Sequence, residues 1–343
     1  MTTVPQTTVP DPNTTSILAA ARAACDPLLR RVISELPQPM QLMAGYHFGW
    51  RDPQGRPIDE RSGKGLRAAL VFAVTAACRG DRAAAAPAAA AVELMHNFTL
   101  VHDDVMDADE LRHGRATVWK VWGRDAALLL GDALHASAIR MVLDVPALAV
   151  GQAVARLEDA AIELCRGQFE DYAFESRKHV DIDEYLHMAM GKTGSLMGAA
   201  CALGALCAGA GAGLVSAYDT FGRELGMAFQ FTDDIIGITG DAAVIGKPVG
   251  SDLARRKRTL PVIAALQTGH RAAAELADLY ASGKPLGAED ITYATELVTT
   301  TGGVHQTQKH ADARMQAAID ALPTALATPE LYALTRAITR RDR

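Results

Sequence analysis

Two short acidic segments interrupt long apolar stretches of the sequence. The first lies in NFTLVHDDVMDADELRHGRATVW and contains Asp103, Asp104 and Asp107. The second lies in GMAFQFTDDIIGITGD and contains Asp233 and Asp234. Residues four apart share one face of a helix, so Asp103 and Asp107 repel each other unless a cation lies between them. One such segment alone fits a solvated helix end equally well, but two at the ends of apolar helices predict facing walls of one cavity.

Magnesium is the metal that suits carboxylates in this setting. Mg²⁺ binds carboxylate oxygens, keeps several water ligands and shares its shell with substrate phosphates. Basic residues, which bind phosphate oxygens, follow both acidic segments. They are Arg112 and Arg115 after the first, and Lys247, Arg255, Arg256, Lys257 and Arg258 after the second. The residues by themselves therefore indicate a magnesium-dependent diphosphate site.

The elements that must position these residues are predicted to be helices. Ala, Leu, Met, Glu and Arg, which favour helices, recur along the 343 residues, and β-branched alternation is nearly absent. Turn signals such as PQP near Pro37 and RDPQGRP from Arg51 mark the breaks. Helices are expected at Ser16–Glu35, Gly65–Ala77, Ala83–Asp107, Thr117–Leu143, Val150–Glu175, Ile182–Gly191, Gly194–Ala208, Gly213–Ile238 and Leu260–Thr268. The fold class is therefore all-α, a bundle of about ten or more helices.

Composition argues against several classes of protein. The chain has 34 Lys and Arg against 40 Asp and Glu, and a formal net charge of -6 gives no general attraction to nucleic acid. Hydrophobic residues make up 49% and aromatic residues 5%, so the apolar content is mainly aliphatic. The stretch from Leu196 to Tyr218 has no charge and the length of a membrane span, but Ala and Gly dominate it. It is therefore expected to be a buried helix and not a membrane span.

The N-terminus is polar and rich in Thr and Pro. Residues 1–15 are expected to form a disordered tail and residues 16–343 a single all-helical domain. No basic region leads into an apolar core, so this end does not match a signal peptide. The five cysteines contain no Cys-x-x-Cys pair and do not indicate a disulfide framework. A cytoplasmic location is expected.

Seven segments match, in order, the motifs of a known family. They are SGKGLRA, LMHNFTLVHDDVMD, RHGRAT, GDALHASA, GQFEDYAFE, MGKTGSL and FQFTDDIIGITGDAAVIGKPVGSDLARRKRTLP. Over about residues 60–265 the sequence thereby resembles the trans-polyprenyl diphosphate synthases, the enzymes of head-to-tail isoprenyl chain elongation. A single DDxxD is weak evidence, but chance does not explain seven ordered matches. The resemblance implies the isoprenoid synthase fold, a single large helical bundle around a central apolar cavity.

The resemblance also implies which residues hold the allylic diphosphate. Three Mg²⁺ would bridge it to Asp103, Asp107 and Asp233, with Asp104 and Asp234 supporting them. Its cationic contacts carry over to Arg112, Lys192, Lys247 and Lys257.

Isopentenyl diphosphate has a separate subsite in this family, which carries over to Lys64, Arg67 and His96.

Thr193 and Gln230 match residues whose dipoles face the developing allylic cation. In the implied reaction an allylic carbon–oxygen bond breaks, pyrophosphate leaves, and the alkene of isopentenyl diphosphate attacks the carbocation. Water would quench the cation, so the pocket must be apolar and closed. The family also implies a homodimer.

Four positions depart from the family pattern. Gly65 and Ala68 replace an Arg and the Pro of the first motif. His113 replaces an Arg that normally contacts isopentenyl diphosphate, so the affinity or pH dependence of that subsite is in question. Gly237 stands where the second acidic motif usually has its third Asp, which puts the fine metal geometry in question. An active elongating enzyme is the favoured interpretation, and a weakened or accessory subunit is the alternative.

Product length is expected to depend on Phe98, five residues before Asp103. At 1.5 Å per helical residue this ring lies roughly 7.5 Å deeper than the carboxylate and would act as a floor. An aromatic residue here, with no insertion in DDVMD, resembles geranylgeranyl (C20) diphosphate synthases, with farnesyl (C15) diphosphate as the alternative product. A class I terpene cyclase also uses DDxxD, but its second motif and the absence of an isopentenyl site distinguish it from this sequence.

Overall fold

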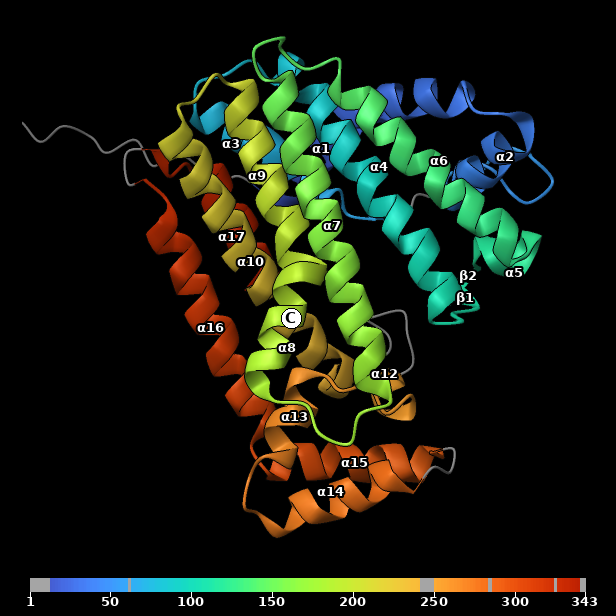
Figure 1. The fold of residues 1–343 in the computed structure, drawn as a ribbon, viewed down its shortest axis with the longest axis vertical. Helices are drawn as coiled ribbons and strands as arrows, with labels where there is room; N and C mark the ends of the chain where they lie inside the picture. Colours follow the sequence, from blue (N-terminus) through green and yellow to red (C-terminus); the bar gives the residue numbers. More distant parts are fainter. Residues whose placement is uncertain (1–12, 61–62, 241–249, 283–285, 324–325, 340–343) are drawn as a thin grey trace, which may run out of the picture.

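The computed structural model of the protein describes residues 13–60, 63–240, 250–282, 286–323 and 326–339. Helices dominate these residues, and the one named sheet within them is a two-stranded hairpin, in which Leu111 pairs with Ala116 and Arg112 with Arg115. The predicted all-α fold class is confirmed. Figure 1 shows the longer helices packed side by side, with a pair of helices across the lower end of the view.

The first half of the chain carries the first acidic segment. Its elements are α1 (Thr14–Ser34), α2 (Gln38–His47), α3 (Leu66–Ala77), α4 (Arg82–Met106), β1 (Leu111–Arg112), β2 (Arg115–Ala116), α5 (Val118–Trp122), α6 (Arg124–Val142) and α7 (Val150–Glu175).

The second half carries the second acidic segment. Its elements are α8 (Ile182–Ala189), the π-helical turn η1 (Met190–Gly194), α9 (Ser195–Cys207), α10 (Ala212–Thr239), α12 (Ser251–Ala254), α13 (Leu260–Leu266), α14 (Arg271–Ala281), α15 (Ala288–Thr300), α16 (Gly303–Ala321) and α17 (Pro329–Thr339).

Two long helices bring the acidic segments to the site, and both end close to where the sequence predicts. Helix α4 begins after Asp81, whose side chain accepts a hydrogen bond from Ala83 N, and it ends at the acidic segment, with Asp107 as its C-cap. Helix α10 continues one residue past its predicted end at Ile238. Helix α4 packs against α3, α6 and α9, and α10 packs against α9 and α16. Most of the buried apolar residues of these helices form one continuous core.

The prediction of one continuous helix over Thr117–Leu143 is wrong, because the structure has two helices there. Gly123 has a φ of 91°, a conformation that glycine adopts without a side-chain clash, and it separates α5 from α6. Helix α2 is not among the predicted helices, because the PQP signal at its start indicates only a break. The helices expected on either side of residues 192–193 are joined through η1. Such π-helical turns are rare and concentrate at functional sites.

The charge-free stretch from Leu196 is a buried helix followed by a turn. All 13 residues of α9 are buried, and the chain turns at Ala208–Gly211 before α10 begins. The buried-helix prediction is confirmed. Among the described residues, no helix combines the length and apolar character that crossing a membrane requires.

At the N-terminal end, α1 begins at Thr14, two residues earlier than predicted, because the Asn13 side chain accepts a hydrogen bond from Thr15 N. The remainder of the predicted tail, residues 1–12, lies outside the described residues.

Candidate active site

The two carboxylates of the first acidic pair differ in burial. Asp103 is partly exposed, whereas Asp104 is only 2% exposed. Arg112 donates to Asp104 Oδ1 from Nε over 2.8 Å and from Nη2 over 2.6 Å. Burial raises the pKa of Asp103 to about 6, and the nearby Asp107 adds to the rise while Lys192 opposes it. The ionised form of Asp103 is therefore destabilised in the metal-free protein, and a bound cation would stabilise it.

The second acidic pair on α10 repeats this difference. Asp233 is partly exposed and lines a cavity, whereas Asp234 is 3% exposed. Three donors surround Asp234: the Tyr185 hydroxyl, Gln230 Nε2 at 2.9 Å and the backbone N–H of Leu260 at 3.1 Å. Burial nevertheless raises the pKa of Asp234 to about 7.

A shared acidic partner holds two of the predicted lysines together. Asp171 Oδ2 lies 2.6 Å from Lys192 Nζ and 3.2 Å from Lys257 Nζ. Burial alone would raise the pKa of Asp171, but Lys257 and Lys192 lower it to about 2. Asp171 ends the GQ-x-x-D match, so the sequence contains a signal for it, but the match alone gives this carboxylate no role. Lys247 lies outside the described residues.

The loop after α12 contacts the first acidic segment. Arg255 Nη1 lies 2.8 Å from Asp109 Oδ1, and the same guanidinium donates to the Asp107 carbonyl. Lys257, two residues later, is close enough to Asp103 and Asp107 to affect their electrostatics. Basic residues that follow the second acidic segment in sequence thus lie near the first.

The Lys-Thr pair lies in the π-helical turn η1, packed closely on α7. A Cβ at Gly167 would lie 2.3 Å from Lys192 N, so only glycine permits this approach. Thr193 donates from Oγ1 to Gln230 Oε1 over 2.7 Å. Both residues predicted to face the allylic cation are therefore in direct contact.

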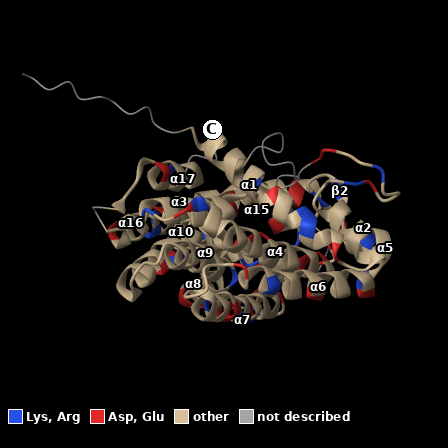
Figure 2. Cartoon of the chain, turned by 90° about the horizontal axis from the view of Figure 1, so that it is seen from above, with Lys and Arg blue, Asp and Glu red and all other residues tan. Residues whose placement is uncertain are grey.

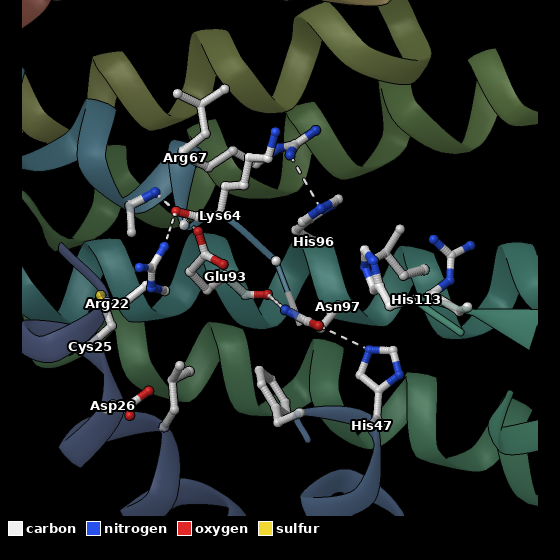
Figure 3. A pocket seen from close by; sticks show the side chains of 18 of the residues that line it. Arg22, Cys25, Asp26, His47, Lys64, Arg67, Glu93, His96, Asn97 and His113 are labelled. Carbon is white, nitrogen blue, oxygen red and sulfur yellow. Dashed lines mark hydrogen bonds between the residues drawn. The ribbon is translucent and has the colours of Figure 1, made fainter. Parts of the chain in front are cut away.

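A cavity of about 320 Å³ lies between α1, α2, α3 and α4 and contains the predicted isopentenyl subsite (Figure 3). Lys64, Arg67 and His96 line it, together with Asp233 of the second acidic pair. Arg67 donates from Nη1 to His96 Nε2 over 3.2 Å, which requires this nitrogen to be unprotonated. Burial, followed by the charge of Arg67, lowers the pKa of His96 well below its usual value. His96 is therefore neutral at pH 7.

Three further cavity residues were not predicted. Arg22 of α1 donates from Nη1 to the Lys64 carbonyl over 2.9 Å, and His47 Nε2 lies 2.9 Å from Asn97 Oδ1 (Figure 3). Burial, with the charge of Arg112, lowers the pKa of His47 to about 4. No motif singles out Arg22 or His47, because α1 and α2 are distant in sequence from the acidic segments. Asn97 lies within LMHNFTLVHDDVMD, but the match gives it no role.

The departures from the family pattern have local explanations at two positions. Gly65 has a φ of 66°, and a Cβ there would lie 2.8 Å from Arg22 Cγ, so the α1 side chain occupies this space. At Gly237 a Cβ would lie 2.6 Å from Asp252 Oδ2. A carboxylate from α12 thus approaches the position of the missing third Asp. The other two, Ala68 and His113, are buried and cavity-lining, respectively.

Phe98 is held between two histidine rings. Its centroid lies 4.9 Å from that of His102 and 5.2 Å from that of His135. His102 Nε2 lies 2.9 Å from the Leu128 carbonyl, and His135 Nε2 lies 2.9 Å from Glu158 Oε1. The ring is therefore fixed against α6.

The donor chemistry of the site fits magnesium. Within the described residues, no three His, Cys, Asp or Glu side chains form a cluster that could hold a metal by themselves. Asp103, Asp107 and Asp233 are all partly exposed carboxylates on the two walls. Mg²⁺ accepts one or two carboxylates when phosphate oxygens complete its shell, so this arrangement suits it.

Figure 2 shows acidic and basic residues interspersed along the helices.

Comparison with known proteins agrees with this geometry. The sequence model of the polyprenyl synthetase family matches residues 56–298. Geranylgeranyl diphosphate synthase of Mycobacterium tuberculosis is 52% identical, covering 95% of this chain and 94% of that protein. The (2E,6E)-farnesyl diphosphate synthase of Mycobacterium bovis is 44% identical, covering 84% of this chain and 82% of that protein.

Among solved structures, a polyprenyl synthetase from Streptomyces coelicolor A3(2) superposes with a TM-score of 0.90 at 37% identity, covering 95% of this chain and 99% of that one. The match in sequence, fold and ordered motifs leads to one conclusion: the chain belongs to the polyprenyl synthetase family.

Proposed function

We propose that this chain is a magnesium-dependent prenyltransferase that condenses isopentenyl diphosphate with an allylic diphosphate of C5 to C15. Its product is geranylgeranyl diphosphate. One observation carries the proposal: Asp233 of an acidic pair lines the same cavity as Lys64, Arg67 and His96. Two diphosphate subsites, one using metal and one using only basic side chains, therefore share a wall. The names of the two mycobacterial relatives support this assignment.

Asp103, Asp107 and Asp233 are the proposed metal ligands, for three Mg²⁺ per site, with Asp104 and Asp234 supporting them from the protein side. When bound, the metal neutralises charge on the diphosphate as it becomes a leaving group. Arg112 pairs with Asp104 through two contacts, which holds the end of α4 in place.

The chain's cations position the allylic diphosphate. Lys192 and Lys257 both contact Asp171, whose Oδ2 lies 2.6 Å from Lys192 Nζ and 3.2 Å from Lys257 Nζ. Both lysines can turn to phosphate oxygens while Asp171 continues to balance their charge. Arg112 and Lys247 complete the proposed cationic set. These side chains stabilise pyrophosphate as its charge develops.

The second substrate binds without metal. Lys64 and Arg67 provide the fixed charges for isopentenyl diphosphate, and His96, neutral in the described state, gains a proton or donates from its other nitrogen. His113 completes the rim in place of the Arg of the family pattern. The fully buried α9 excludes water from the neighbouring core.

Product length is proposed to be C20, with Phe98 as the floor. His102 and His135 hold its ring, so it cannot swing aside as the chain grows. Farnesyl diphosphate, the product named for the second relative, is the alternative.

The decisive experiment supplies Mg²⁺, labelled isopentenyl diphosphate and each of the C5, C10 and C15 allylic primers, and measures product length. Elongation to C20 that stops when a chelator is added is expected. No elongation with any primer contradicts the proposal. Lys64→Ala serves as the discriminating variant: it should raise KM for isopentenyl diphosphate and leave KM for the primer unchanged. A terpene cyclase would consume the primer alone.

A homodimer is also proposed, through α7. Ile162, Phe169 and Tyr172 are 68%, 73% and 59% exposed and lie on one face of this helix, and Leu129 of α6 is 56% exposed. A stripe of this kind is typical of an interface. Light scattering should give the mass of two chains, and Phe169→Glu should give one. A cytoplasmic location stays a prediction.

A further inference from the structure

A buried chain of hydrogen bonds runs from α8 to the Lys-Thr pair. The Tyr185 hydroxyl and the backbone N–H of Leu260 both donate to Asp234 Oδ2, the latter over 3.1 Å. Gln230 Nε2 donates to Asp234 Oδ1 over 2.9 Å. Thr193 Oγ1 donates to Gln230 Oε1 over 2.7 Å. Five residues from four elements thus form one connected network.

For the ionised Asp234, the direction of every bond in this network follows from one fixed donor. The N–H of Leu260 cannot reverse, so Asp234 Oδ2 must accept. Asp234 Oδ1 is then the acceptor left for Gln230, whose amide turns its NH₂ group to the carboxylate and its carbonyl to Thr193. Thr193 must therefore donate its only hydroxyl proton. The lone pairs of Thr193 Oγ1 become the electron-rich end of the network.

The Thr193 end of the network adjoins the predicted site residues, and the carboxylate end is enclosed by the protein. Thr193 follows Lys192, whose charge affects Asp103, and Gln230 is partly exposed one turn before Asp233. Thr193 is 6% exposed, and Asp234 is 3% exposed and surrounded by donors from the protein. Of the two neighbouring aspartates, Asp233 lines the cavity and Asp234 is not among its lining residues.

We propose that Asp234 is a positioning residue that orients Gln230 and Thr193, so that their oxygen lone pairs face the allylic cation. Asp233 alone supplies the metal-facing carboxylate of this pair. The inference rests on the proposed function, because it assigns the network to the cation of that reaction. Oriented dipoles stabilise a developing charge without reorganising during the reaction, which is why their direction matters.

The test is Asp234→Asn, which keeps the shape of the side chain and changes one acceptor into a donor. Leu260 N–H holds the new amide oxygen in the Oδ2 position, so the NH₂ group replaces Oδ1 and faces Gln230. The Gln230 amide must then turn over and present its NH₂ group to Thr193. The Thr193 hydroxyl accepts that bond and directs its own proton elsewhere, so positive ends replace lone pairs near the cation.

The expected result is a split between turnover and binding. For Asp234→Asn, kcat should fall about 10²-fold, by analogy with the loss of one oriented dipole from an active site, while KM for the primer changes little. Calorimetric titration of Mg²⁺ into the protein with inorganic pyrophosphate should give wild-type affinity. Asp233→Asn should weaken this metal binding.

Tyr185→Phe provides a second variant that keeps the fold. It removes one donor to Asp234 and leaves the other two, so a smaller fall in kcat is expected, again with unchanged metal binding. Tyr218→Phe is its matched control. Tyr218 is a fully buried tyrosine on α10 whose hydroxyl donates to the Leu326 carbonyl over 3.5 Å, away from the network, and its loss should leave kcat unchanged.

Three results would overturn the inference. Asp234→Asn could weaken Mg²⁺–pyrophosphate binding as much as Asp233→Asn does, which would make Asp234 a metal ligand. It could retain wild-type kcat, which would make the direction of the network irrelevant. If Asp234→Asn does not fold, an unchanged kcat in Tyr185→Phe would show that the reaction does not depend on how firmly Asp234 is held, which contradicts its positioning role. Absence of elongation by the wild-type enzyme contradicts the proposed function instead, and the binding measurements remain interpretable.

Discussion

Replacing Asp103 by Asn should stabilise the metal-free protein while abolishing its activity. Burial raises the pKa of this carboxyl from its ordinary value of 3.8 to about 6. Because the folded-state pKa lies above the unfolded one, ionisation costs folding free energy at pH 7. The cost is fully present above the folded pKa and is lost as pH falls through 6 toward 4. Asn carries no charge and never incurs it.

The size of the effect follows from the pKa difference. At pH 7 the shift corresponds to about 3 kcal/mol of folding free energy, and at pH 5, where most of the folded state is protonated, to about half of that. The gain for Asp103→Asn should therefore shrink as the solution is acidified. Turnover should fall by orders of magnitude at every pH, because a proposed metal ligand is lost.

The assay is urea unfolding of both proteins in chelator at pH 7 and pH 5, followed by the same measurement with Mg²⁺ and pyrophosphate. Ligands should stabilise the wild type more than the variant, which lacks one proposed metal ligand. Asp278→Asn, an exposed position on α14, is the control and should change stability by less than about 0.5 kcal/mol. A variant that is less stable than wild type at pH 7, or whose gain does not diminish at pH 5, would refute the reasoning.

Three further predictions concern single side chains. Phe98→Ala should extend the product by one isoprene unit, and an unchanged C20 product by chromatography would contradict its role as floor. Arg112→Ala leaves the buried Asp104 without its guanidinium partner, so the free energy of unfolding measured in urea should fall by about 3 kcal/mol or more. Lys120→Ala, which removes an exposed pair with Glu110, is the control and should lower it by less than about 1 kcal/mol. Gly167→Ala should lower kcat, because its Cβ would lie 2.3 Å from Lys192 N, and a wild-type rate would show that η1 tolerates displacement.

The parts of the fold set by local pattern were predictable from sequence. The apolar runs that end in DDVMD and TDDII predict α4 and α10, and their observed ends agree within one residue. The charge-free stretch beginning at Leu196 predicts α9 as a buried helix. In each case the signal lies in residues adjacent in the chain, and helix periodicity alone carries it.

Features set by distant contacts were not predictable in this way. The turn η1 depends on the backbone of Gly167, which lies more than 20 residues earlier. The pairing of His47 with Asn97 joins α2 to α4 across 50 residues. Asp252 approaches Gly237 only because α12 folds back on α10. Single-sequence reasoning assigns residue types to a site, but it does not say which of them touch.

One division of roles recurs in both acidic pairs. Two neighbouring aspartates on a helix point about 100° apart, and in each pair one carboxylate is partly exposed while the other is buried. The buried one lies inside the protein, where an ionised carboxylate requires donors. Arg112 meets this need for Asp104, and Tyr185 contributes to meeting it for Asp234. A DD pair at a helix end therefore predicts a metal ligand and, behind it, a buried hydrogen-bond network that fixes the wall. The partners of the second aspartate belong to this network, and through them residues outside any motif become necessary to the site.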